Sequence, residues 1–342
     1  MRKILAPVLF VFTAAALLTG CKKDTNSSLT PVTLNEVAHS IFYAPQYAAI
    51  ELGYFEEEGI DLTLVNGAGA DKVMTALVSG DADIGFMGSE ASIYTYIQGD
   101  DDYAVNFAQL TQRAGNFLVS REPIDDFQWD MLKGKTVLGG RAGGMPEMVF
   151  EYILKQNHID PASDLTIDQN IDFGSTAAAF SEEKADYDFT VEFEPGATNL
   201  EKQGKGYVVA SLGTDSGYGP YTAFSAKKSY ISQHPEIIQG FTNALQKGMN
   251  YVASHTPEEI AQTIAPQFKE TTPDTITTIV SRYYKQDTWK KDLIFRQESF
   301  DLLQDILEDA GELKKRAPYK NLVTTIYAEK SAKAVKDTTL SH

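Results

Sequence analysis

The sequence predicts an α/β protein of two lobes, with the second lobe inserted into the first. From Val32 onwards, short apolar runs alternate with amphipathic stretches, as strands and helices do in domains with mostly parallel sheets. The chain has 342 residues, which exceeds the usual size of a single hydrophobic core. Two lobes imply a cleft between them.

The first twenty residues have the layout of a secretory signal and are not counted as part of the fold. Arg2 and Lys3 precede an apolar run over residues 4–18, which is short for a membrane-spanning helix of about 20 residues. Leu18-Thr19-Gly20-Cys21 resembles the bacterial lipobox, in which the cysteine is lipidated and becomes the first residue. The alternative is an uncleaved anchor with a buried Cys21. This single cysteine excludes an internal disulfide.

Polar segments flank the predicted globular part. Residues 21–31 have no apolar periodicity and are predicted to be a flexible tether. Residues 328–342 are rich in Lys, Ser and Thr and are predicted to be a disordered tail. The predicted first lobe comprises residues 32–120 and 221–327, and the predicted second lobe comprises residues 121–220.

The first lobe is predicted to contain three strand–helix units. Gly53 and Gly80 follow two of the apolar helical patterns and are expected to end those helices. The predicted strands cover residues 32–37, 60–65 and 84–87, and the predicted helices cover residues 45–52, 71–78 and 89–97. The carboxyl ends of the strands should form the edge that faces the ligand.

The second lobe repeats the alternation. Residues 117–121 are predicted to be a strand that leaves the first lobe, with Pro123, Asp125 and Asp126 marking the boundary. Further strands are predicted at residues 136–138, 165–167, 189–191 and 208–212, and helices at residues 145–156 and 175–181. Residues 221–225 are predicted to be the returning strand, so that two segments cross the hinge.

The remaining chain is predicted to be helical. Pro235 begins one helix, Thr256 and Glu259 form a capping box for the next, and residues 299–307 form a further one. We expect these helices to pack back on the first lobe, with their Tyr and Phe residues in its core.

Several motifs occur in the order found in one family. Residues 43–55, Tyr-Ala-Pro-Gln-Tyr-Ala-Ala-Ile-Glu-Leu-Gly-Tyr-Phe, are followed by Glu58-Gly59-Ile60-Asp61-Leu62, by Ala76-Leu77-Val78-Ser79-Gly80-Asp81-Ala82-Asp83-Ile84-Gly85, by Leu132-Lys133-Gly134-Lys135-Thr136 and by Glu194-Pro195. Together with the lipobox, this series resembles the nitrate, sulfonate, taurine and thiamine-pyrimidine group of substrate-binding proteins. The resemblance covers most of residues 32–325.

The resemblance implies a type II periplasmic-binding-protein fold that closes on its ligand by hinge motion. It also implies a monomeric, lipid-anchored protein outside the cell, which hands a small molecule to an ABC permease and its ATPase. The family includes an enzyme branch, the eukaryotic thiamine-pyrimidine synthase, which carries a cysteine-rich iron motif. No cysteine follows Cys21 in this chain.

The sequence predicts no catalytic site, cofactor or metal. It contains neither His-Glu-x-x-His nor Gly-x-Ser-x-Gly, and Gly134-Lys135-Thr136 lacks the phosphate-loop glycine because Trp129 occupies that position. Gly67-Ala68-Gly69 lacks the third glycine of a dinucleotide fingerprint, since Lys72 stands there. The five histidines show no metal-ligand spacing. A formal net charge of −17 excludes nucleic acid as a favoured partner.

Loops between strand ends and helix starts are the candidate ligand contacts, because helix starts present free backbone N–H groups. Four glycine-containing loops qualify: residues 67–71, 88–90, 140–144 and 174–176. Turn geometry alone would also explain their glycines. The resulting candidates are Tyr43, Gln46, Gly69, Ser89, Glu90, Arg141, Gly144, Met145, Ser175, Thr176 and Glu194.

Four of these side chains bear on the class of ligand. Tyr43 could stack on a planar ligand or belong to the core, and Arg141 could grip an anion or form a surface ion pair. Glu90 either binds ligand or complements the dipole of its helix, and Glu194 is the better candidate carboxylate. A carboxylate accepts hydrogen bonds from amino groups and repels a sulfonate.

The leading hypothesis is a thiamine-precursor-like aminopyrimidine ligand, which the carboxylates favour. An aliphatic sulfonate, taurine or nitrate is the alternative, which Arg141 favours. Two other classes stay open: an extracellular enzyme that uses Glu90 or Glu194, for which no partner base is evident, and a lipoprotein that senses a ligand and signals through a membrane partner. Genes for a permease and an ATPase adjacent to the gene for this protein would support a role in import.

Overall fold

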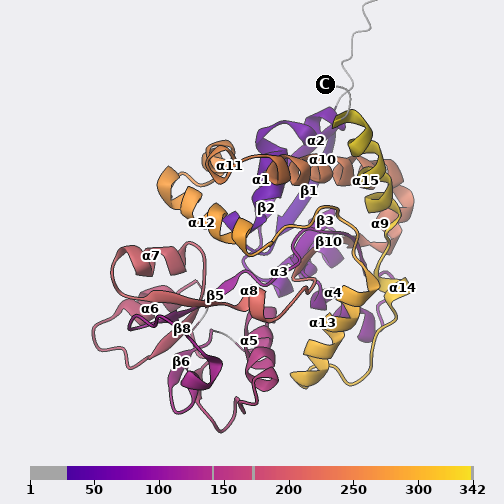
Figure 1. The fold of residues 1–342 in the computed structure, drawn as a ribbon. Coiled ribbons are helices and arrows are strands. Elements are labelled where there is room, and N and C mark those ends of the chain that lie inside the picture. Colours follow the sequence, from indigo (N-terminus) through magenta and orange to yellow (C-terminus); the bar gives the residue numbers. More distant parts are fainter. Residues whose placement is uncertain (1–28, 141, 172–173, 340–342) are drawn as a thin grey trace, which may run out of the picture.

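The computed structural model describes residues 29–140, 142–171 and 174–339, and these residues form two lobes, each built on one five-stranded sheet (Figure 1). The predicted signal, Cys21 and Arg141 lie outside the described residues. No helix in the described ranges is long and apolar enough to cross a membrane.

The sheet of the first lobe combines three parallel strands with two antiparallel ones. In spatial order its strands are β2 (Ile60–Asn66), β1 (Thr30–Glu36), β3 (Ile84–Gly88), β10 (Thr222–Lys227) and β4 (Ala104–Gln109). β1 pairs in parallel with β2 and β3, whereas β10 runs antiparallel to β3 and β4. Strand β4 was not predicted, because Asn106 and Gln109 interrupt its apolar pattern although both are buried.

Short helices connect these strands. They are η1 (Ile41–Tyr43), α1 (Ala44–Glu51), α2 (Tyr54–Glu57), α3 (Ala70–Ser79) and α4 (Glu90–Ile97). Gly53 follows α1 with φ 71° and Gly80 follows α3 with φ 86°, a left-handed conformation that glycine adopts without steric cost. The two predicted helix ends are therefore confirmed.

The second lobe has the same plan. Its strands, in spatial order, are β7 (Thr166–Asp168), β6 (Thr136–Leu138), β8 (Phe189–Phe193), β5 (Asn116–Ser120) and β9 (Tyr207–Ser211). β6 is parallel to β7 and β8, and β5 is antiparallel to β8 and β9. The helices of this part of the chain are η2 (Trp129–Leu132), α5 (Met145–Gln156), α6 (Thr176–Ser181), α7 (Gly196–Lys202) and α8 (Leu212–Asp215).

One predicted boundary is wrong. Residue 121 was predicted to begin the second lobe, but β5, which ends at Ser120, already lies inside the second sheet between β8 and β9. Its residues Phe117, Leu118 and Val119 are fully or almost fully buried there. The second sheet therefore starts at Asn116, and the strand does not leave the first lobe but enters the second.

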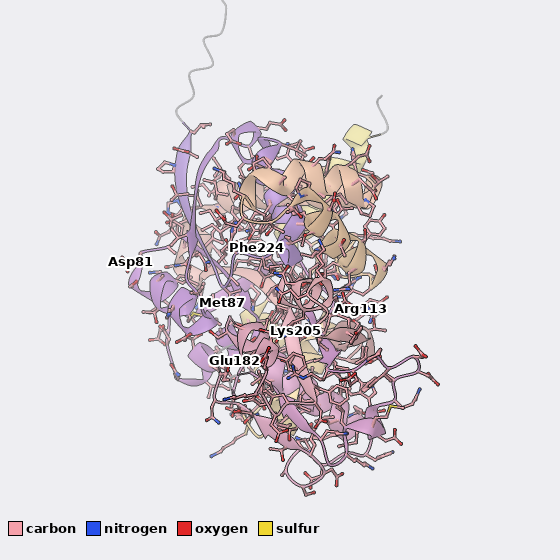
Figure 2. All side chains as sticks on the ribbon, turned by 90° about the vertical axis from the view of Figure 1, so that its left-hand side faces the viewer. Asp81, Met87, Arg113, Glu182, Lys205 and Phe224 are labelled. Atoms are coloured by element: carbon pink, nitrogen blue, oxygen red, sulfur yellow. The ribbon has the colours of Figure 1, made fainter. Side chains whose placement is uncertain are left out.

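Two segments connect the lobes, as predicted. Residues 110–115 lead from β4 to β5, and residues 212–221 lead from β9 to β10. Arg113, which lies near the junction of the lobes in Figure 2, donates from Nη1 to the carbonyl oxygens of Gly213 (2.9 Å) and Thr214 (3.2 Å). A Cβ on Gly213 would lie 2.3 Å from the carbonyl oxygen of Ala114, so the two segments approach as closely as only glycine permits.

The C-terminal half is helical and contacts both lobes. It contains α9 (Lys228–Gln233), α10 (Pro235–Ser254), α11 (Pro257–Ile264), η3 (Ala265–Gln267), α12 (Pro273–Lys285), α13 (Gln297–Asp309), α14 (Tyr319–Leu322) and α15 (Ile326–Thr339). The predicted capping box of Thr256 and Glu259 is present. Helix α10 packs on α1, as expected, but α12 also contacts α7, and α13 also contacts α5 (Figure 1).

Two terminal predictions are also wrong. The tether was predicted to reach residue 31, but Thr30 and Pro31 belong to β1 and pair with Ile60 and Asp61. The tail predicted over residues 328–342 is helical as far as Thr339. The polar composition of this segment suggested disorder, but its small residues Ala328 and Ser331 are fully buried against α10. Ser331 Oγ donates to Asn243 Oδ1 and accepts from Gln239 Nε2 (2.6 and 2.9 Å).

Candidate ligand-binding site between the lobes

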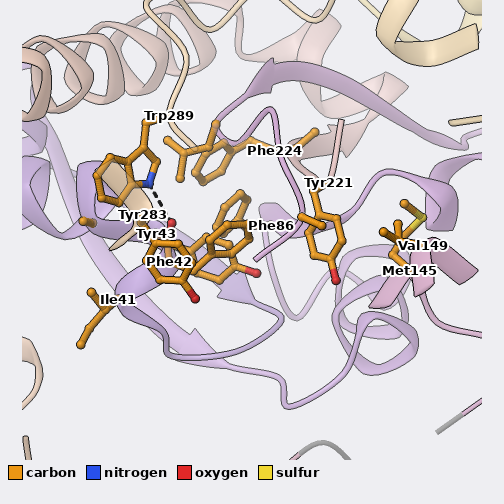
Figure 3. Packing of buried hydrophobic residues seen from close by; sticks show 14 of the residues in the cluster. Ile41, Phe42, Tyr43, Phe86, Met145, Val149, Tyr221, Phe224, Tyr283 and Trp289 are labelled. Atoms are coloured by element: carbon orange, nitrogen blue, oxygen red, sulfur yellow. Dashed lines mark hydrogen bonds between the residues drawn. The ribbon is translucent and has the colours of Figure 1, made fainter. Parts of the chain in front are cut away.

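Aromatic side chains form the part of the first lobe that faces the second. Tyr43 packs edge-on against Phe86 at 4.5 Å between ring centroids, and Phe42 packs edge-on against Tyr221 at 5.7 Å. In Figure 3, Tyr221 stands between this aromatic group and Met145 of α5 in the second lobe. The two lobes therefore meet across a largely aromatic surface, close to the ends of β1, β3 and β8.

Glu90 begins α4, one residue after Ser89 follows β3, and is a buried acid at this surface. Its side chain is buried, and its Oε2 has no hydrogen-bond partner among the described residues. Burial raises the pKa of Glu90 from its usual value near 4.5 to about 7, because a carboxylate loses hydration when it leaves water. Gly88 makes room for this side chain, since a Cβ there would lie 2.3 Å from both carboxylate oxygens.

Tyr221 and Ser89 lie beside Glu90. Ser89 Oγ donates to the carbonyl oxygen of Pro220 at 3.0 Å, which ties the start of α4 to the returning segment. The hydroxyl of Tyr221 is buried and has no hydrogen-bond partner in the described part of the chain. Burial raises the pKa of Tyr221 well above its usual value. The pairing of Thr222 with Gly88 keeps this segment beside the start of α4.

Gln46 belongs to a separate buried cluster at the end of β1. Glu36 Oε2 accepts from Gln46 Nε2 (2.7 Å) and from the hydroxyl of Tyr47 (2.8 Å), and Glu36 Oε1 lies 2.7 Å from Nδ1 of His39. The hydrogen bond to Glu36 raises the pKa of His39. Because Gln46 donates to a carboxylate, its Oε1 is the atom left without a partner in the described structure.

In the second lobe, α5 begins at Met145 with Gly144 as its N-cap, and Pro146, which has no backbone N–H, occupies its first turn. Met145 is buried, and Asn116 of β5 donates from Nδ2 to the carbonyl oxygen of Pro146 at 3.3 Å. Gly140 and Gly143 both have positive φ, so the loop before α5 depends on glycine. This loop contains Arg141, whose own position lies outside the described residues.

Glu194 is occupied within the protein. Its Oε2 accepts from the backbone N–H of Thr198 (2.9 Å) and its Oε1 accepts from the hydroxyl of Thr198 (3.0 Å), which caps α7. Oε1 also pairs with Arg282 of α12, and the same guanidinium pairs with Glu201 of α7 at 2.6 Å. The Glu194 side chain is fully buried. In this structure its carboxylate connects the lobes.

Thr176 and Ser175 lie at the start of α6, close to a third buried acid. Glu192 Oε2 accepts from Thr176 Oγ1 (3.0 Å), and Glu192 Oε1 accepts from Thr190 Oγ1 (2.7 Å). Burial raises the pKa of Glu192 to about 7, although both threonine hydroxyls lower it. Ser175 is exposed. Gly69, the N-cap of α3, is partly exposed, and its N–H donates to the carbonyl oxygen of Val37, which follows β1.

Tyr43 thus packs on Phe86 of β3, the strand that leads to Ser89 and Glu90, and Figure 3 shows Met145 on the far side of Tyr221. Gln46 and Glu194 are instead engaged with Glu36 and Arg282. The sequence did not point to Tyr221, Asn116 or Glu192.

Two surface cavities of about 610 and 570 Å³ are lined by none of the predicted contacts. One lies beside α5 and β7, and the other lies between α10 and α15. Among the described residues, no group of three or more His, Cys, Asp or Glu could hold a metal ion.

The raised pKa of Glu192 predicts a pH-dependent stability. The folded protein holds a proton on this carboxyl up to about pH 7, whereas the unfolded chain releases it near pH 4.5, so stability falls as pH rises through this interval. Glu192→Gln should therefore be more stable than the native protein at pH 8, by about 1–2 kcal/mol, and similar to it at pH 5. Urea denaturation at both pH values measures this. The exposed Glu183→Gln should show no such dependence, and an equal change in both variants would contradict the assignment.

Comparison with known proteins agrees with this architecture. A family model described as NMT1/THI5 like matches residues 41–260. The chain belongs to the NMT1/THI5-like family. It is also 46% identical over 313 residues to the putative binding protein YtlA of Bacillus subtilis strain 168, and the match covers 92% of each chain.

Solved structures show that this member of the NMT1/THI5-like family has the periplasmic-binding-protein fold. The ligand-binding component of an ABC-type import system from Staphylococcus aureus, with zinc bound, superimposes with a TM-score of 0.71 at 16% identity over 88% of this chain and 99% of that one. The alkanesulfonate-binding protein SsuA of Xanthomonas axonopodis pv. citri, bound to MOPS, gives 0.68 at 14% identity over 86% and 98%. At these identities the likeness concerns the fold.

Proposed function

We propose that this protein is the extracytoplasmic binding component of an ABC importer and that it binds its ligand between the lobes without catalysing a reaction. Membership of the NMT1/THI5-like family, the likeness to YtlA and the shared fold with the import component from Staphylococcus aureus support this role. The two connecting segments and the insertion of one lobe into the other suit a hinge that closes on a ligand.

Glu90 carries the proposal for the ligand class. A buried carboxylate with one unpaired oxygen is costly unless a donor arrives, and an N–H group of a ligand would remove that cost. Tyr43 and Tyr221 add aromatic side chains to the same region, which suits a planar ring. A planar heterocycle with an amino group, such as a thiamine-precursor-like aminopyrimidine, fits both features.

A sulfonate, taurine or nitrate is the second candidate. The start of α5 carries the positive end of the helix dipole, which favours an anion, and the predicted contact Arg141 precedes this helix. The alkanesulfonate-binding protein has the same fold. We place this candidate second, because nitrate and a simple alkanesulfonate bring only acceptors to the unpaired oxygen of Glu90, whereas within this group taurine alone has an ammonium that would donate to it.

A thermal-shift screen separates the two candidates. A ligand that binds only the folded protein raises its melting temperature in proportion to the logarithm of its concentration. We expect aminopyrimidines to raise the melting temperature of the mature protein, and we expect nitrate and alkanesulfonates without an amino group to leave it unchanged. A shift with the sulfonates alone would reverse this order of candidates.

The proposed lipid anchor gives a further prediction. Cys21→Ala should release the protein into the soluble fraction, because acyl chains on Cys21 would supply nearly all of its membrane attachment. Fractionation of cells that express either form measures this, with Cys21→Ser as a second variant that keeps a polar side chain. Membrane association that persists in both variants would contradict lipidation at Cys21.

A further inference from the structure

A second unpaired acceptor lies on the other lobe. Asn116 is fully buried, and its Oδ1 has no hydrogen-bond partner in the described ranges. The amide orientation follows from the other end of the group, because Nδ2 donates to the carbonyl oxygen of Pro146. An amide oxygen buried without a donor is uncommon in folded proteins, and each such atom calls for an explanation.

The position of Asn116 places it where the lobes meet. It is the first residue of β5 and pairs with Phe193 at the end of β8, and the ring of Phe193 lies 6.4 Å from that of Tyr221. The preceding residue, Gly115, lies against the ring of Phe42 in the first lobe, where a Cβ would come within 2.8 Å. The Gly115 carbonyl oxygen also accepts from the hydroxyl of Tyr283 on α12. Asn116 is thus the second-lobe residue that directly follows a contact with the first lobe.

We infer that Asn116 is a specificity-determining residue, whose Oδ1 accepts a hydrogen bond from a second N–H group of the ligand. This inference rests on the proposed function, in which Glu90 accepts the first. The unpaired acceptors that this inference uses are then a carboxylate oxygen on the first lobe and an amide oxygen on the second; the Tyr221 hydroxyl and Arg113 Nε are also unpaired among the described residues. The site therefore selects a ligand with N–H donors at two separate positions on a planar ring.

Energetics support this division of roles. Glu90 offers a charge-assisted hydrogen bond, whereas Asn116 offers a neutral one. The neutral hydrogen bond is weaker, but the buried amide oxygen still loses its hydration if that bond stays unmade. A ring with a single amino group can satisfy only one of the two acceptors. A diamino ring satisfies both when the lobes close, and we expect discrimination of about five- to tenfold between the two ligands.

The test compares two probes with two variants. Diaminopyrimidine and monoaminopyrimidine are titrated by calorimetry into the native protein, Asn116→Leu and the control Asn199→Leu, which makes the same change at an exposed position of the second lobe. We expect the native protein and the control to prefer the diamino ring about five- to tenfold, and Asn116→Leu to bind both rings alike. The melting temperature of each unliganded variant is recorded, because a purely structural role would lower it while leaving the preference intact.

The outcomes separate this inference from the proposed function. If aminopyrimidines bind and Asn116→Leu retains the full preference for the diamino ring, the role of Asn116 is overturned while the proposed ligand class stands. If neither ring binds the native protein, the proposed ligand class fails, and the role of Asn116 fails with it.

Discussion

Replacing Arg282 by alanine is expected to lower the free energy of unfolding by about 3 kcal/mol. Arg282 on α12 neutralises Glu194, whose side chain is fully buried, and also pairs with Glu201 at 2.6 Å. Without the guanidinium, the carboxylate of Glu194 keeps only its two hydrogen bonds from Thr198. A buried charge without its counter-charge is among the largest single sources of destabilisation.

Urea denaturation of the native protein and the variant measures this loss. Arg316→Ala is the matched control, because Arg316 also pairs with two acids, Asp305 and Glu308, but at an exposed site, where we expect less than about 1 kcal/mol. The double variant Arg282→Ala with Glu194→Gln should recover part of the loss, since it removes the stranded charge. A loss for Arg282→Ala no larger than that of the control would show that the pair contributes little.

Glu90→Gln is expected to weaken binding of an aminopyrimidine about ten- to a hundredfold. The substitution keeps the shape of the side chain and removes the charge that an amino group would contact. It also removes the cost of burying a carboxylate, so the unliganded variant should be at least as stable as the native protein at pH 8. Weaker binding together with unchanged or higher stability marks a ligand contact.

Calorimetric titration between pH 6 and 8 extends this test. Because the pKa of Glu90 lies near 7, the native protein should bind more tightly as the pH rises and the carboxylate ionises, whereas Glu90→Gln should lose this dependence. Glu258→Gln serves as the control, since Glu258 occupies the first turn of α11 at an exposed position. Equal affinities for the native protein and Glu90→Gln at every pH would remove Glu90 from the site.

Local patterns were sufficient to predict much of the fold. Strand β6 and helix α5 begin and end where the sequence placed them, because an apolar run bounded by glycine turns is a local signal. Strand β4 was not predicted, because its buried Asn106 interrupts the apolar pattern. The Asn106 side chain is buried because it donates hydrogen bonds to Ser92 Oγ and to the carbonyl oxygen of Leu322, which a local pattern does not show. Helix α15 was not predicted for a similar reason, since its buried side chains pack against α10. Burial that depends on distant partners leaves little trace in a local pattern.

The candidate site shows the same limit. Glu90 could be predicted because an acid at a strand end that opens a helix is visible in the sequence. The ion pair of Glu194 with Arg282 could not be predicted from the sequence, because the two residues are 88 positions apart. Only the packing of α12 on α7 brings them together. Asn116 begins strand β5, and Tyr221 ends the segment that returns to the first lobe. Their shared neighbour is Phe193 at the end of β8, so the local sequence does not show that the two residues lie where the lobes meet.

A crystal structure of the mature protein with diaminopyrimidine tests the central claim most directly. The account predicts a ring between the lobes, stacked near Tyr43 and Tyr221, with one nitrogen about 3 Å from Glu90 Oε2 and a second nitrogen at a similar distance from Asn116 Oδ1. Arg282 should remain paired with Glu194 in that complex. A ring bound outside the junction of the lobes, or one between the lobes with both acceptors still unpaired, would contradict it.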